Sequence, residues 1–342
     1  MLRVLQSGIG VIEKSAAMSA SISKGIVMMH SRKDRVRTAL AGLPLATAAL
    51  AEKGPGAGGP QIGNQLFSFR YLVQNLDVII KGMTDVGLNS CELWSPILEP
   101  LILPPFYGNP GQPTPTPALE QAREELRKWR MTVSMNVFKE AYKKFTDAGI
   151  DIYAYNCTFN QSFTDGEIER AFDMAEALGV KLITASATLA VAKRVVPFAE
   201  KRKLRVAVHN YSIADSPDEF CGPESLAAAL KLSNYIWLAF DIGYFTSAGH
   251  DPVAYIREHH DRIALIRLKD KPVERGSVAR YSARSGSTVQ WGWGSTPIKE
   301  VLQLLKREKY PIPAMIEYEY EGERGPVGEV KRCYDYAKAT LA

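Results

Sequence analysis

Between Gln61 and the C-terminus, short runs of β-branched and aromatic residues alternate with amphipathic stretches of ten or more residues. This alternation indicates βα units arranged around a parallel sheet. Eight such units in about 280 residues fit a single-domain α/β fold, the (β/α)8 or TIM barrel, better than a six-stranded doubly wound sheet. The sequence does not predict a nucleotide-binding fold, because no GxGxxG follows the first strand and no P-loop motif is present.

The expected elements follow from this rhythm. The predicted strands are Ile62–Phe67, Ser90–Trp94, Asp151–Asn156, Lys181–Thr184, Arg205–His209, Ile236–Asp241, Arg262–Leu268 and Ala314–Glu317. The predicted helices are Gln74–Val86, a pair within Ala118–Asp147, Thr164–Leu178, Leu189–Arg202, Pro223–Leu232, Pro252–His259, Thr296–Arg307 and a last one from Val327. Glycine directly follows three of these helical patterns, as expected at helix C-termini.

Residues 1–60 read as an N-terminal extension, and residues 61–342 as the barrel domain. A basic stretch at 31–37 precedes an apolar stretch that is too short to span a bilayer and ends in the small-residue site Ala49-Leu50-Ala51. The segment at about 28–51 resembles a twin-arginine export signal with Lys33 in place of the second arginine. A Gly/Pro linker follows at 54–60. We expect an exported, periplasmic protein; the alternative is a disordered tail on a cytoplasmic protein.

The net charge argues against two classes of partner. Residues 1–51 hold seven basic and two acidic residues, so the whole net charge of +5 lies in them and the remaining 291 residues are formally neutral. A neutral body has no electrostatic footprint for nucleic acid or for an anionic membrane. We therefore expect no nucleic-acid partner and no membrane association after signal cleavage; the oligomeric state is left open.

Polar residues recur where the predicted strands end. In a TIM barrel the chemistry lies at the C-terminal ends of the strands and in the loops that follow them. His209, Asp241, Arg267 and Glu317 close four successive strands and should converge above the barrel; the alternative is that they are ordinary caps or salt bridges. The full set of polar candidates is Glu92, Asn156, His209, Asp241, Arg267, Lys269, Asp270 and Glu317.

From Gln61 onward the chain resembles the xylose isomerase-like sugar isomerase/epimerase barrels. The resemblance is carried by the order and spacing of several short motifs. These are Gly87-Leu-Asn-Ser-Cys-Glu-Leu-Trp94, Val206-Ala-Val-His-Asn-Tyr211, Phe240-Asp-Ile-Gly-Tyr-Phe245, Arg267-Leu-Lys-Asp270 and Ile316-Glu-Tyr-Glu319. It implies a TIM barrel, a sugar substrate, a divalent ion (often manganese) held by Glu, Asp, His and Glu, and two carboxylates that shuttle a proton beside a carbonyl.

The chain departs from this family pattern at the metal. Arg267 and Tyr244 stand where the resemblance leads us to expect histidines, and arginine remains protonated and cannot coordinate a cation. If a metal is retained, its candidate ligands are His209, Glu219, Asp241 and Glu317. We expect a degraded metal site with no tightly bound cofactor; bound manganese or zinc is the alternative.

Arg267 suggests what replaces the metal. A guanidinium placed between Asp241 and Glu317 would satisfy both carboxylates and polarise a substrate carbonyl, with Glu317 and His209 as an acid/base pair. The alternative is an ion pair that only keeps the pocket folded. The predicted catalytic residues are therefore Glu317, His209 and Arg267. The predicted substrate-binding residues are Glu92, Lys269, Tyr244, Trp291 and Trp293.

Two functions remain open. The first is a sugar isomerase or epimerase, with a lyase as a related possibility, that acts on a sugar or keto-sugar by proton transfer beside a carbonyl. The second is a carbohydrate-binding pseudoenzyme of the same fold. A repair nuclease of the endonuclease-IV type is excluded, because the neutral body offers neither a basic groove nor a histidine-rich zinc cluster.

Overall fold

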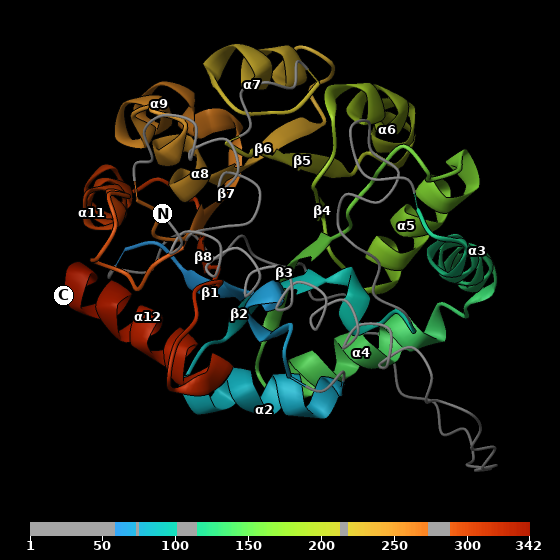
Figure 1. The fold of residues 1–342 in the computed structure, drawn as a ribbon, viewed down its shortest axis with the longest axis horizontal. Helices are drawn as coiled ribbons and strands as arrows, with labels where there is room; N and C mark the ends of the chain where they lie inside the picture. Colours follow the sequence, from blue (N-terminus) through green and yellow to red (C-terminus); the bar gives the residue numbers. More distant parts are fainter. Residues whose placement is uncertain (1–58, 73–74, 101–114, 213–217, 273–287) are drawn as a thin grey trace, which may run out of the picture. The chain divides into compact units, whose positions relative to one another are not determined.

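Eight parallel strands close into a barrel in the computed structural model, which describes residues 59–72, 75–100, 115–212, 218–272 and 288–342 (Figure 1). Each strand pairs with the next along the chain, and β8 pairs with β1 to close the sheet. The strands are β1 (Ile62–Gln65), β2 (Ser90–Trp94), β3 (Asp151–Asn156), β4 (Leu182–Ala185), β5 (Arg205–His209), β6 (Ile236–Asp241), β7 (Ile263–Leu268) and β8 (Ala314–Ile316). The predicted TIM barrel is confirmed.

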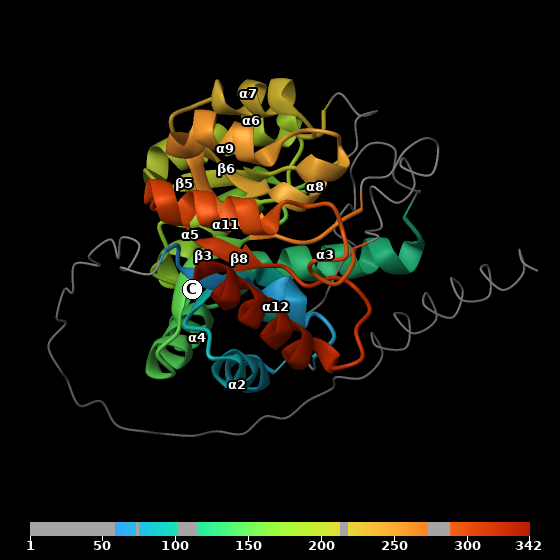
Figure 2. The same cartoon turned by 90° about the vertical axis from the view of Figure 1, so that its left-hand side faces the viewer.

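Helices surround this barrel, as Figures 1 and 2 show. They are α2 (Leu76–Val86), α3 (Pro117–Thr132), α4 (Asn136–Asp147), α5 (Asp165–Ala177), α6 (Leu189–Arg202), α7 (Pro223–Leu230), α8 (Ile242–Ser247), α9 (Pro252–His259), α11 (Ile298–Glu308) and α12 (Gly325–Leu341). Their ends follow local chemistry: Thr164 and Glu167 form a capping box at the start of α5, and Gly87 ends α2 with a φ of 87° that favours glycine.

Among the differences from the sequence-based prediction, two concern the chain directly after β1 and directly after β6. The first strand ends at Gln65, and the chain turns into a 3-10 helix, η1 (Leu66–Phe69), because the Gln65 side chain accepts a hydrogen bond from the backbone of Phe67. Directly after β6, Asp241 caps the unpredicted helix α8, accepting a hydrogen bond of 2.8 Å from the backbone N–H of Tyr244. The strand-end carboxylate therefore also begins a helix.

The barrel interior changes character along its axis. Below the charged end, the barrel is filled by apolar and mostly small side chains. One core cluster there consists of Ala154, Leu182, Ala207, Ala239, Ala264, Leu265 and Met315. Gly63 is required here, because a Cβ at that position would lie 2.4 Å from the Met315 sulfur. Alternate residues of a strand point to the same side of the sheet. Toward the C-terminal ends of the strands, the positions that face the barrel interior are charged or polar. A second, larger core packs the helices against the outside of the strands.

The predicted export signal lies outside the described residues, as does all of the predicted linker except Gly59 and Pro60. Within the described ranges, no helix is both long enough and apolar enough to cross a membrane.

Candidate active site

Six charged or polar side chains meet inside the C-terminal end of the barrel. All are buried, and they come from β2, β5 and β6, from the end of β7, and from the residues just after β8. They are Glu92, His209, Asp241, Arg267, Lys269 and Glu317. The alternation of strand residues explains the set: on β7 the inward order is Leu265, Arg267 and then Lys269, so an apolar layer is followed by two cations.

Arg267 is held by Glu92 across the barrel. Its Nε donates to Glu92 Oε2 at 3.1 Å, and its Nη2 donates to Oε1, which also accepts from the Thr184 hydroxyl. Its Nη1 lies 3.8 Å from Glu317 Oε2. The prediction that Arg267 bridges Asp241 and Glu317 is therefore right only for Glu317, because the planar fork of the guanidinium is used by the carboxylate of β2 and no ion pair with Asp241 is found among the described residues.

Lys269 occupies the bridging position instead. Its Nζ lies 3.1 Å from Asp241 Oδ2, 3.2 Å from Glu317 Oε2 and 2.9 Å from Glu319 Oε1. The ammonium also lies 4.3 Å from the centroid of the Tyr244 ring. Burial alone would lower the pKa of Lys269, but the neighbouring carboxylates outweigh it and raise that pKa well above its ordinary value. Lys269 is therefore a permanent cation and not a free amine nucleophile.

Asp241 remains ionised in this environment. Burial would raise its pKa, but the Lys269 ammonium and the hydrogen bond to His209 lower it to about 2. His209 Nε2 lies 3.3 Å from Asp241 Oδ2. Burial and the charge of Arg267 lower the pKa of His209 to about 3, so its imidazole is neutral at neutral pH.

The hydrogen bond to Asp241 assigns the histidine tautomer. Because the ionised carboxylate can only accept, His209 Nε2 carries the proton and Nδ1 carries the lone pair. Nδ1 is buried and accepts no hydrogen bond from the residues that the structure describes. His209 Nδ1 can therefore accept a hydrogen bond, but with its pKa lowered to about 3 the imidazole is neither a general acid nor an effective base at neutral pH.

Glu317 is the carboxyl group of the site whose pKa lies close to neutral pH. Burial raises its pKa to about 7, against the opposing influence of Lys269 and Arg267. Within the described ranges its Oε2 makes these two ion pairs but accepts no hydrogen bond of good geometry. Glu317 can therefore exist both as a base and as an acid close to neutral pH.

Aromatic rings form one wall beside these charges. The His209 ring packs edge-on against Tyr211 with centroids 4.6 Å apart, and Tyr244 lies 5.8 Å from His209. The rings of Tyr211 and Tyr244 are 5.4 Å apart. Tyr244 therefore places a ring face against the Lys269 ammonium. The family resemblance led us to expect a metal-binding imidazole at this position.

The two tryptophans of the loop after β7 have different environments. Trp291 is 5% exposed and packs edge-on against Tyr336 at 5.8 Å, whereas Trp293 is 77% exposed. Asp270 fixes this loop, because its carboxylate accepts hydrogen bonds from the backbone of Gly292 at 2.7 Å and of Gly294 at 3.0 Å. Trp291 is therefore part of the core, and Trp293 is the tryptophan open to a ligand.

Three predicted metal ligands lie together. One ligand atom each of His209, Asp241 and Glu317 falls within 4.8 Å of the others, and Glu219 is buried but outside this group. Lys269 Nζ already lies within 3.2 Å of both carboxylates of the group. A divalent ion and an ammonium about 4 Å apart repel by about 8 kcal/mol at an effective dielectric constant of about 20. The residues do not fit a divalent ion while Lys269 holds this position.

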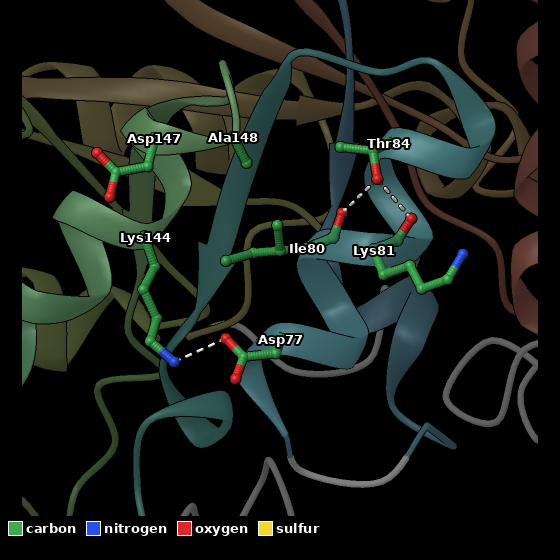
Figure 3. A pocket seen from close by; sticks show the side chains of 7 residues that line it. All are labelled: Asp77, Ile80, Lys81, Thr84, Lys144, Asp147 and Ala148. Carbon is green, nitrogen blue, oxygen red and sulfur yellow. Dashed lines mark hydrogen bonds and ion pairs between the residues drawn. The ribbon is translucent and has the colours of Figure 1, made fainter.

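A separate surface pocket lies between α2 and α4 (Figure 3). It contains the ion pair of Lys144 with Asp77 at 2.6 Å and the side chain of Ile80. None of the residues that line it belongs to the charged cluster in the barrel. This pocket is therefore not the candidate reaction site.

The family follows from a match of residues 119–336 to the model of the xylose isomerase-like TIM barrel. The chain belongs to this family. No curated protein matches the chain. Among solved structures, this xylose isomerase-like barrel is similar to a sugar phosphate isomerase/epimerase from Parabacteroides distasonis, with 16% identity, a TM-score of 0.54, and coverage of 86% of this chain and 98% of the other.

Two further solved structures share the fold. A 3-keto-D-glucoside 4-epimerase from E. coli has 11% identity and a TM-score of 0.57, with 82% of this chain and 99% of the other covered. The IolI protein, whose structure holds a zinc atom, has 12% identity and a TM-score of 0.53, with 82% of this chain and 95% of the other covered. At these identities the likeness shows the fold of this xylose isomerase-like barrel and not its reaction.

Sequence reasoning missed two members of the site. Glu319 binds Lys269 at 2.9 Å, and Thr184 donates to Glu92. A signal for Glu319 was present, because it lies two residues after Glu317 and therefore on the same side of the extended chain. Thr184 closes a predicted strand, but a single hydroxyl at that point carries no chemical signature.

Proposed function

We propose that this xylose isomerase-like barrel is an enzyme that moves a proton at the carbon beside a carbonyl of a sugar or keto-sugar, as an isomerase or epimerase. The observation that carries the proposal is Glu317: it is buried beside two cations, its pKa is about 7, and its Oε2 accepts no hydrogen bond from the described residues. A general base works best when its pKa lies near the ambient pH. The family and the names of two structural neighbours support this reaction class.

The site assigns different tasks to its carboxyl groups. In an isomerisation, the Glu317 carboxylate takes the proton from the substrate carbon and returns it to the adjacent carbon on the same face of the enediol. In an epimerisation, Glu317 acts on one face only, because inversion requires that a proton return to the opposite face. Asp241 remains ionised, because its pKa is about 2. Negative charge that develops on the substrate oxygen lies in the field of Arg267 and Lys269, whose positions are fixed before the reaction by their buried ion pairs.

Substrate contacts are proposed for three further side chains. The lone pair of His209 Nδ1 accepts a hydrogen bond from a sugar hydroxyl, which would satisfy a buried atom that has no hydrogen-bond partner among the described residues. The faces of Tyr244 and of the exposed Trp293 are the surfaces on which the apolar side of a sugar ring packs. We also propose that the reaction needs no divalent ion, because two fixed cations supply the positive charge.

Solvent exchange tests the reaction. A panel of ketoses and keto-glycosides is incubated with the protein in D2O, and loss of the proton signal beside the carbonyl is followed by NMR. Glu317→Gln should slow the exchange by about 10²- to 10⁴-fold. Glu319→Gln is the matched control, because this nearby acid is bound to Lys269 and its pKa is lowered, so its loss should slow exchange far less.

The pseudoenzyme remains the second candidate, and one observation favours it. Glu92, Asp241, Glu317 and Glu319 each have a cationic partner in the barrel, which also suits a pocket that is only held together. In that case the NMR experiment shows saturable sugar binding without deuterium incorporation for any member of the panel. Exchange that is independent of Glu317 would refute the assignment of the base.

We also propose that the protein is exported through the signal-like segment before Ala51. The proposal rests on the basic and apolar pattern of residues 28–51. Fractionation of cells that express the full chain should place the shortened protein outside the cytoplasm. Replacement of Arg32 and Lys33 by Gln should retain it inside; an unchanged distribution would contradict export by this route.

A further inference from the structure

The ammonium of Lys269 is surrounded by carboxylate oxygens, as a bound metal ion would be. It is 1% exposed and has carboxylate oxygens of Asp241, Glu317 and Glu319 between 2.9 and 3.2 Å away. An ammonium has three N–H donors, and here three carboxylates surround them. Two of those carboxylates, together with His209, also form the only group of possible metal ligands found among the described residues.

We propose that Lys269 serves as a built-in cation in place of a divalent metal ion, and that removing its side chain uncovers a zinc site formed by His209, Asp241, Glu317 and Glu319. This inference rests on the proposed function for its view that the reaction is metal-free, but the metal-binding prediction stands on the contacts alone. Arg267 does not take this place, because Glu92 holds its guanidinium.

The distances between the ligand atoms suit the ammonium of Lys269 and, once that side chain is removed, a zinc ion. Zinc bonds to carboxylate oxygen and imidazole nitrogen are about 2.0–2.2 Å long, so two ligand atoms of a tetrahedral zinc ion lie about 3.4 Å apart. The ligand atoms of His209, Asp241 and Glu317 lie within 4.8 Å of one another, which requires shifts of less than about 1 Å. Loss of the lysine also releases Glu319, which lies outside this group of three and becomes the fourth ligand only when its side chain moves toward the ion.

The lysine blocks this site in two ways. Its charge repels an ion near Asp241 and Glu317, and its ammonium nitrogen already lies within 3.2 Å of the two oxygens that the ion would need. The side chain is also packed closely against the start of α8, because a Cβ at Gly243 would lie 2.5 Å from Lys269 Cγ. Lys269→Ala removes both obstacles, whereas Lys269→Met removes the charge but leaves most of the volume.

Metal binding is the test, and it does not depend on knowing the substrate. Wild type, Lys269→Ala and Lys269→Met are dialysed against zinc and then analysed for metal content; calorimetry gives the affinity, and thermal melts are recorded over a range of zinc concentrations. We expect one equivalent in Lys269→Ala with a melting temperature that rises with zinc. Wild type should hold well below one equivalent, and its melting temperature should not respond.

Two controls locate the ion. Lys271→Ala removes the next lysine along the chain, whose Nζ lies 4.9 Å from the same Tyr244 ring, and should create no site. The double variant Lys269→Ala/Asp241→Asn should lose at least about 10-fold in zinc affinity, because removal of a ligand costs no less than the loss of an outer partner.

One tightly held zinc ion in the wild type would overturn the proposal, and so would a folded Lys269→Ala that binds no zinc. If Lys269→Ala folds only when zinc is added, the ion has replaced the ammonium and the proposal is supported; failure to fold even with zinc overturns it. These outcomes are separate from the proposed function, whose failure would appear as absent deuterium exchange in the wild type.

Discussion

Removing one partner of the buried pair of Arg267 and Glu92 should be among the most destabilising single substitutions at the mouth of the barrel. Both side chains are almost fully buried, and the guanidinium makes two contacts with the carboxylate from a strand on the far side of the barrel. Arg267→Met leaves Glu92 with the Thr184 hydroxyl as its remaining donor. Removing one partner of a buried ion pair costs about 3–5 kcal/mol, because the other charge is left uncompensated.

Urea denaturation followed by circular dichroism measures this loss. A change of 3–5 kcal/mol corresponds to a melting temperature lower by roughly 6–20 °C in a domain of this size class. The double variant Glu92→Gln/Arg267→Met should recover about 2 kcal/mol or more, since no buried charge of the pair is then left alone.

The control is Arg127→Met. Its pair with Glu124 lies within one helix turn at the protein surface, and such exposed pairs contribute about 1 kcal/mol or less. If Arg267→Met cost no more than this surface variant, the bidentate contact across the barrel would not exist in solution. The assignment of Lys269 as the bridging cation would then lose its geometric basis.

Three further predictions concern the loop tryptophans, pH and the N-terminal extension. Trp291→Ala should destabilise the protein by about 3–5 kcal/mol, whereas Trp293→Ala should leave the melting temperature unchanged and weaken sugar binding in calorimetry; the reverse pattern would refute their placement. Burial raises the pKa of Glu317 from 4.5 to about 7, so the folded state binds the proton more tightly than the unfolded state. This contribution to stability is fully present below about pH 4.5 and is lost as the pH rises through about 7, while exchange activity should rise over the same interval; Glu317→Gln should abolish both trends. A chain that begins at Gln61 should melt at the same temperature as the full chain, and a large loss of stability on truncation would contradict the predicted domain boundary.

The amino-acid sequence by itself determined the order of the strands and placed their ends within one or two residues of the observed bounds. Val206–His209 and Trp237–Asp241 have local β propensity, and their polar ends mark the side of the barrel where chemistry occurs. The caps of α2 and α5 are equally local, because Asn75, Thr164 and Glu167 bond to residues within three positions. The candidate residues of the site were visible for the same reason: a strand of period two fixes which side chains face inward.

Only the tertiary structure decided which acidic side chain pairs with Arg267 and which pair with Lys269. Arg267 and Glu92 lie 175 positions apart in the chain, and no local pattern could show that Glu92 rather than Asp241 binds the guanidinium. The choice of Lys269 as the bridge follows from its position beyond Arg267 in the closed barrel, where the last residue of β6 and the first residue after β8 lie close to its ammonium. Burial likewise separates Trp291 from Trp293 and raises the pKa of Glu317, because desolvation depends on every neighbour at once and not on the adjacent residues alone.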